Sequence, residues 1–127
     1  MTSPPAELAA FLHGEIDAAG FRHRDHVRMG FEVLARHPLL EAALAVERAL
    51  KTMAASAGAP NAYHATVTVA FLALINERMA RDPSAQFEGF AEANPDLFDK
   101  DVLKRWYGAK LREPLARRTF LLPEAGA

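Results

Sequence analysis

The amino-acid sequence predicts an all-α fold, a single-domain antiparallel bundle of about five or six helices over residues 1–127. Apolar residues recur at helical spacing along most of the chain. No stretch alternates apolar and polar residues clearly, as a half-buried strand would. The segment TVTVAF, residues 66–71, is rich in β-branched residues, but its apolar pattern continues over about twenty residues, which exceeds the usual length of a strand. We therefore interpret it as part of a helix.

Two helices are expected in the first third of the chain. The first runs from about 5 to 19 and is stopped by Gly20, a typical residue just past a helix end. The second begins near Asp25, a suitable N-cap, and ends before Pro38. Their inward-facing residues are expected to be Leu8, Phe11, Leu12, Ile16, Ala19, Val27, Phe31 and Leu34.

Four further segments complete the predicted bundle. A third helix covers 38–56 and precedes the clearest break, SAGAP, and a fourth starts near Asn61 and ends near Arg81. A fifth covers about 84–93, and a short sixth covers about 99–107. The residues of the third helix expected to face inward are Leu40, Ala43, Leu44, Leu50 and Met53. The segment FLLP near the end is expected to close the bundle, and residues 123–127 to be mobile.

Composition excludes several classes of function. The chain has 15 basic and 16 acidic residues, and this balance argues against a general nucleic-acid partner. There is no cysteine, which excludes disulfides and thiolate ligands and is consistent with the cytoplasm. The longest apolar run is shorter than the roughly 20 residues of a membrane span. We therefore expect a cytoplasmic protein without a membrane partner.

The segment FRHRDHV, residues 21–27, is the most distinctive motif. His23 and His26 are three residues apart, a spacing that places two side chains on one face of a helix. His64 is expected in the first turn of the fourth helix, at the same end of an up-down bundle. Three neutral imidazoles with one open position form a familiar site for a divalent transition metal such as zinc, iron or copper.

Two other interpretations of this cluster stay open. One is a metal-free pocket for a small anionic ligand, attracted by Arg22 and by the free N–H groups at the helix starts. The other is that these histidines are only polar residues at the beginnings of helices. In either kind of site, Asp25 would orient an imidazole, while Tyr63 and Thr68 would line the pocket. Each of the last two has a structural alternative, because a helical threonine commonly bonds to the preceding turn.

The C-terminal part of the chain combines basic and aromatic residues. Such a combination is typical of a protein or nucleic-acid interaction adaptor, although a solvated helix face explains it as well. The residues are Lys100, Lys104, Arg105, Trp106, Tyr107, Lys110, Arg112, Arg117 and Arg118.

Several short motifs together resemble a pattern found in small, uncharacterised bacterial helical proteins. They are F-x-H-x-x-H-V-R at 21–28, Y-H-x-T at 63–66, FLALI-x-E-R at 71–78, NPDL at 94–97 and RWY at 105–107. The resemblance implies no established activity. It implies only that His23, His26 and His64 should be tested together.

Overall fold

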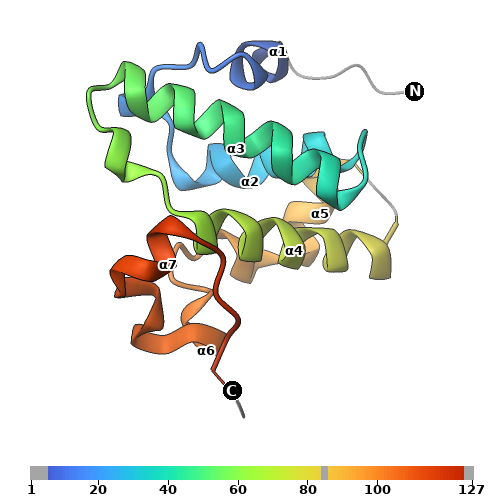
Figure 1. Ribbon diagram of the computed structural model, residues 1–127. Coiled ribbons are helices and arrows are strands. Elements are labelled where there is room, and N and C mark those ends of the chain that lie inside the picture. The colour runs from blue at the N-terminus through green and yellow to red at the C-terminus, as the bar shows by residue number, and fades with distance from the viewer. Residues whose placement is uncertain (1–5, 84–85, 125–127) are drawn as a thin grey trace. The chain divides into compact units, whose positions relative to one another are not determined.

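The computed structural model describes residues 6–83 and 86–124 (Figure 1). Within these ranges the chain forms seven α-helices and four short 3-10 helices, and no strand. The all-α prediction is therefore confirmed, with more and shorter helices than expected. The chain divides into two compact units, residues 1–63 and 64–127. Each unit is described by itself.

The first unit consists of three α-helices that contact one another. They are α1 (Glu7–Leu12), α2 (His23–Leu34) and α3 (Leu39–Ser56). The 3-10 helix η1 (Ala18–Gly20) lies between α1 and α2, and η2 (Pro60–Ala62) follows α3. The predicted apolar stripe of α2 is confirmed, since Val27, Phe31 and Leu34 are all buried.

The predicted C-terminal end of the first helix and the predicted N-cap of the second are wrong, whereas the second helix ends before Pro38 as expected. α1 ends at Leu12, and Gly14 follows with a φ of +71°, the left-handed conformation that glycine adopts most readily. Gly14, and not Gly20, is therefore the glycine that stops this helix. α2 begins at His23, two residues before the expected start near Asp25. Arg22, and not Asp25, is its N-cap, and Asp25 is the third residue of the helix.

The predicted inward face of α3 is only partly right. Met53 is buried, but Leu40 is 83% exposed and Leu44 is 46% exposed. The buried face is instead lined mainly by smaller side chains at helical spacing: Ala42, Val46, Ala49, Met53 and Ala54. Small side chains allow neighbouring helices to approach closely, so this face packs even though the leucines lie elsewhere.

The second unit is built on the long helix α4 (Ala65–Arg81), which α7 contacts. The intervening elements are α5 (Phe87–Ala93), η3 (Pro95–Phe98), α6 (Lys104–Tyr107) and η4 (Gly108–Arg112), and α7 covers Pro114–Arg118. The α4 helix begins at Ala65, four residues after the expected start near Asn61, and His64 is its N-cap. The sixth helix, predicted over 99–107, is reduced to the four residues of α6.

Several predictions concern residues near the edges of the described ranges. The expected first residue of the fifth helix, Ser84, and the last three residues of the tail predicted to be mobile lie outside the described residues. Residues 119–124 follow α7 without regular helix. No helix in the described ranges is long and apolar enough to cross a membrane.

Candidate functional site

His23 and His26 both lie in the first turn of α2, although His23 was expected to precede the helix. Their spacing of three residues places them on one face of the helix. An aromatic stack supports His26 from the preceding segment. The ring of Phe21 stacks on that of Phe11 with centroids 5.4 Å apart, and it meets the imidazole of His26 edge to face at 4.5 Å. This packing fixes one side of the His26 ring.

Burial favours the neutral form of the His26 imidazole. The pKa of His26 is lowered to about 4, mainly by desolvation on burial and also by the nearby charge of His23, while Asp25 acts in the opposite direction. At neutral pH the ring is therefore uncharged, with one nitrogen lone pair available. Among the described residues, neither ring nitrogen of His26 has a hydrogen-bond partner, and neither is a fully buried unpaired atom.

Asp25 and Arg22 are engaged with each other at the start of α2. The Asp25 carboxylate accepts a hydrogen bond from the backbone N–H of Arg22 at 2.9 Å. Asp25 also donates its own backbone N–H to the Arg22 carbonyl at 2.9 Å. The carboxylate thus supplies a negative charge where the helix dipole favours one. It fixes the conformation of the turn that presents the two histidines.

His64 is held by hydrogen bonds within the second unit. Its Nδ1 accepts a hydrogen bond from the backbone N–H of Val67 at 3.1 Å, which caps α4. Its Nε2 lies 2.8 Å from the carbonyl oxygen of Leu111. Because Nδ1 accepts, Nε2 must carry the proton and donate it to Leu111. Both ring nitrogens are therefore in use, in contrast to those of His26.

Tyr63 and Thr68 have structural partners in separate units. The ring of Tyr63 lies 5.2 Å from the ammonium group of Lys51, a cation–π contact in the first unit. The hydroxyl of Thr68 donates to the carbonyl of His64 at 2.8 Å, one turn back along α4. This bond is the structural alternative that the sequence suggested for Thr68.

The three predicted ligands are divided between the two units. His23 and His26 belong to the first, and His64 belongs to the second. In the part of the chain that the structure describes, no group of three or more His, Asp or Glu side chains is arranged to hold a metal ion. The convergence of the three histidines therefore stays a prediction.

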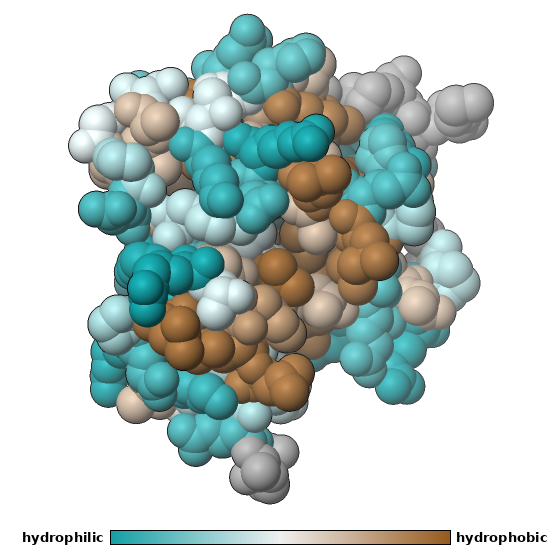
Figure 2. Space-filling model, viewed as in Figure 1, coloured by the Kyte–Doolittle hydropathy of each residue, from teal (hydrophilic) through white to brown (hydrophobic). Residues whose placement is uncertain are grey.

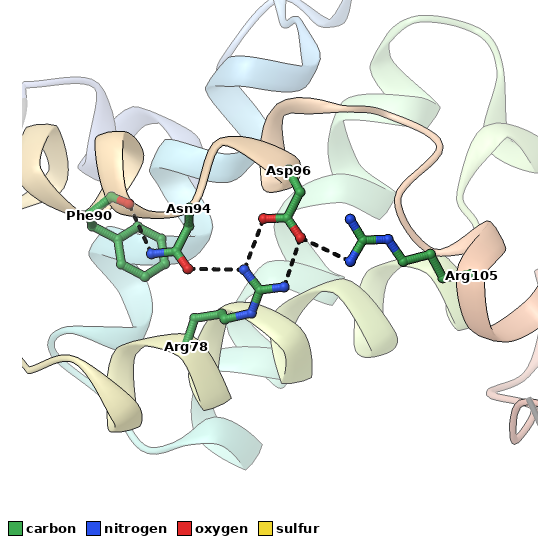
Figure 3. A network of polar contacts seen from close by, with 5 residues as sticks. All are labelled: Arg78, Phe90, Asn94, Asp96 and Arg105. Carbon is green, nitrogen blue, oxygen red and sulfur yellow. Dashed lines mark hydrogen bonds and ion pairs between the residues drawn. The ribbon is translucent and has the colours of Figure 1, made fainter.

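Sequence reasoning missed a polar network in the second unit (Figure 3). Arg78 on α4 forms two hydrogen bonds to the Asp96 carboxylate, at 2.9 and 2.8 Å, and a third to the side-chain oxygen of Asn94 at 2.9 Å. Arg105 approaches the same carboxylate at 3.1 Å, and Asn94 donates to the Phe90 carbonyl. The guanidinium of Arg78 holds the pKa of Asp96 down at about 2.

This network joins separate elements of the second unit. It ties α4 to the turn around η3 and to α6, and every charge in it has an opposite charge beside it. The segment NPDL, residues 94–97, entered the sequence analysis only as part of the resemblance. Because 18 residues separate Arg78 from Asp96, no local pattern in the sequence indicates that the two side chains meet.

Part of the basic C-terminal cluster is also paired within its unit. Lys104 lies 3.5 Å from Asp101, and Lys110 donates to the Leu122 carbonyl at 2.9 Å. Arg105 lies over the ring of Trp106, 5.8 Å from its centroid, while it contacts Asp96.

Comparisons of this chain with protein-family models, with curated proteins and with solved structures gave no match. The resemblance to small bacterial helical proteins stays an expectation from the short motifs.

Proposed function

We propose that this chain is a small metal-binding helical protein in which His23 and His26 form a ligand pair and His64 is the third ligand. One observation supports it above the others. His26 is held neutral by burial, and its ring nitrogens have no hydrogen-bond partner among the described residues. A neutral imidazole with an available lone pair is the form that coordinates a transition metal.

The surroundings of His26 also suit a ligand. Phe21 packs against the ring and restricts its rotation, which reduces the entropy lost when a metal binds. The Asp25–Arg22 contact fixes the turn that carries both histidines. Imidazole ligands suit zinc, iron, copper and nickel, and the chain has no cysteine to select a softer site. A metal held by three histidines would keep one position open for water or a substrate.

The role of His64 requires a rearrangement. Its Nε2 bonds to the Leu111 carbonyl and its Nδ1 caps α4, so coordination must replace one of these bonds. Replacing the Leu111 contact is the less costly choice, because loss of the cap would unpair the N–H of Val67.

The alternative of a metal-free anion site is less well supported. The Asp25 carboxylate already interacts with the backbone N–H of Arg22 at the start of α2, where an anion would bind. A negatively charged ligand would meet this carboxylate at close range.

The decisive experiment measures metal content and affinity in protein purified without an affinity tag. Zinc, iron(II), copper and nickel are titrated into the apo protein by calorimetry. We expect one ion per chain, with an affinity that falls as histidine protonation competes at lower pH. His26→Ala should remove most of the binding, and His64→Ala should do the same.

His13→Ala is the matched control, because His13 is an exposed residue at the end of α1. It should bind like the unchanged protein. Circular dichroism of every variant confirms that the helices are intact. If folded His26→Ala and His64→Ala both retain full metal occupancy, or if the apo protein takes up none of the four metals, the proposal is wrong. If only His64→Ala retains occupancy, His64 is not a ligand.

A further inference from the structure

The helix α3 presents two large leucines outside its buried face. Leu40 is 83% exposed and Leu44 is 46% exposed, and their spacing of four residues places them on one face of the helix. Figure 2 shows hydrophobic surface where α3 begins. Glu47 and Lys51 continue this row by steps of three and four residues, and they bond to each other at 3.3 Å. These four residues form the outward seam of α3, and their spacing is the one by which two helices pair as a coiled coil.

Charged residues of opposite sign flank the seam along one edge. Glu41 and Arg48 each directly follow a residue of the seam, so both lie on the same side of it. Both side chains are exposed, and neither has an ion-pair or hydrogen-bond partner among the described residues. They are about 10 Å apart along the helix axis, so they do not pair with each other. The edge therefore carries an unpaired negative charge near the start of α3 and an unpaired positive charge two turns later.

This distribution of charge is complementary to a reversed copy of itself. When two copies of α3 pack antiparallel about a two-fold axis close to Leu44, Glu41 of each copy lies beside Arg48 of the other. The symmetry makes two equivalent ion pairs. Leu40 then contacts the aliphatic stem of Lys51 of the second copy, while the ammonium group of that lysine stays in water.

The same charges disfavour other arrangements and other partners. A parallel pair of α3 helices places Glu41 beside Glu41 of the second copy, and Arg48 beside Arg48. An antiparallel pair shifted by seven residues, which would stack Leu40 on Leu44, again brings the two Glu41 carboxylates together. An acidic or a basic peptide would meet one repelling charge along this edge. A second copy of the chain is the partner whose charges match both.

We propose that the outward seam of α3 is a self-association surface, and that two copies of this chain pair through antiparallel α3 helices. The helix has 18 residues, which corresponds to a length of about 27 Å. Two leucines on each copy cover only part of the roughly 800 Å² per partner of a standard interface. The dimer is therefore weak, with a dissociation constant in the micromolar range. It requires no metal and does not involve the histidines.

Sedimentation equilibrium of the full-length protein, with EDTA present, measures this association over a range of concentrations. The fraction of dimer should rise with protein concentration and should fall as salt screens the ion pairs. Leu40→Asp should weaken the association by about tenfold or more, because it places a carboxylate from each copy where apolar groups pack. Leu122→Asp is the matched control, because Leu122 is 71% exposed and lies in the second unit. It should leave the association unchanged.

Two charge reversals test the antiparallel register. Glu41→Arg and Arg48→Glu each replace two attractions by two repulsions, so each variant alone should self-associate about tenfold more weakly or less. An equimolar mixture of the two variants should form a heterodimer, because the like charges of one variant then face the opposite charges of the other. The double variant Glu41→Arg/Arg48→Glu should self-associate like the unchanged protein. Circular dichroism confirms that the helices of every variant are intact.

The proposal is overturned if the unchanged protein stays monomeric up to millimolar concentration, or if Leu122→Asp weakens the dimer as much as Leu40→Asp does. It is also overturned if the mixture of charge-reversed variants associates no more tightly than either variant alone. A monomeric protein that Leu40→Asp strongly destabilises against urea would show that another part of the same chain covers the seam, and this result would overturn the proposal as well.

Discussion

The backbone of Gly14 lies so close to Thr52 that a Cβ atom on Gly14 would stand 2.5 Å from both Cβ and Cγ2 of the threonine. Gly14 also has a φ of +71°, which disfavours any residue with a side chain. Two independent constraints therefore require glycine at the end of α1, where the chain turns beside α3.

Gly14→Ala should lower the free energy of unfolding by about 2 to 4 kcal/mol. Roughly 1 to 2 kcal/mol comes from the left-handed backbone and the rest from overlap with Thr52. Gly58→Ala is the matched control, because Gly58 has a φ of +73° but has no atom within 4 Å of the added Cβ. It should show only the backbone cost. Urea unfolding of both variants measures the difference, and equal losses would contradict the proposed overlap.

Asp96 should stabilise the second unit through its contact with Arg78. Asp96→Asn should cost about 1 to 2 kcal/mol at neutral pH, a value reduced to allow for partial exposure of both side chains. Because the folded-state pKa of Asp96 is about 2, below its unfolded value, this stabilisation is present above about pH 4 and is lost as the pH falls toward 2. The difference in unfolding free energy between the two proteins should shrink over this range.

Glu77→Gln provides the control for Asp96. Glu77 bonds to Arg81 at 2.8 Å, but the two side chains are 60% and 74% exposed. Exposed pairs contribute little, so this change should cost less than about 0.5 kcal/mol. A loss as large as that for Asp96→Asn would show that burial does not distinguish the two pairs.

The sequence predicted the elements that depend on neighbours in the chain. The buried stripe of α2 follows from helical spacing, and the break at SAGAP follows from glycine and proline, with Gly58 in a left-handed conformation. The inward face of α3 was predicted mainly from its leucines, and the prediction is only partly right, because packing against neighbouring helices selected a face dominated by small side chains together with Met53. Propensity rules do not contain that information.

The candidate site was predictable only in part, for the same reason. The pairing of His23 with His26 is local and was found from their spacing. The fourth helix was expected to start near Asn61, whereas the imidazole of His64 caps α4 and is held by the carbonyl of Leu111. A contact across 47 residues has no counterpart in a local pattern. The network of Arg78 and Asp96 was missed on the same ground.

His26 should make folding sensitive to acid. Its folded-state pKa is about 4, whereas an unfolded histidine titrates near 6.5. Between these values the unfolded chain binds more protons, so the free energy of unfolding rises with pH. The contribution is complete above about pH 6.5 and is lost as the pH falls to about 4, with an upper limit of roughly 3 kcal/mol.

His26→Phe tests this expectation, because it keeps an aromatic ring beside Phe21 and removes the titration. The pH dependence of urea unfolding between pH 4 and 7 should be flatter than in the unchanged protein. His13→Gln, at an exposed position, should leave the slope as it was. A proton NMR titration reads the same group directly, and a midpoint for His26 near 6.5 would contradict the burial effect.

Thr66 should be the residue that keeps the C-terminal strap, residues 119–124, in place. Thr66→Val preserves the shape of the side chain but leaves the Thr119 carbonyl and the Leu121 N–H without their partner. Because these two main-chain groups lose their shared partner, the free energy of unfolding should fall by about 2 kcal/mol or more. Because both losses fall on the strap, the effect should also be local, with faster tryptic cleavage after Arg118.

Thr68→Val separates this local effect from a general loss of stability. Among the described residues, the Thr68 hydroxyl bonds only to the His64 carbonyl, one turn back in α4. The backbone N–H of Thr68 donates to the same carbonyl. Its removal should cost less than about 1 kcal/mol and leave cleavage after Arg118 unchanged. If Thr66→Val is cleaved no faster than Thr68→Val while both stay folded, the Thr66 hydroxyl does not hold the strap. The bonds from Tyr107 to Leu121 and from Lys110 to Leu122 would then be sufficient to hold it.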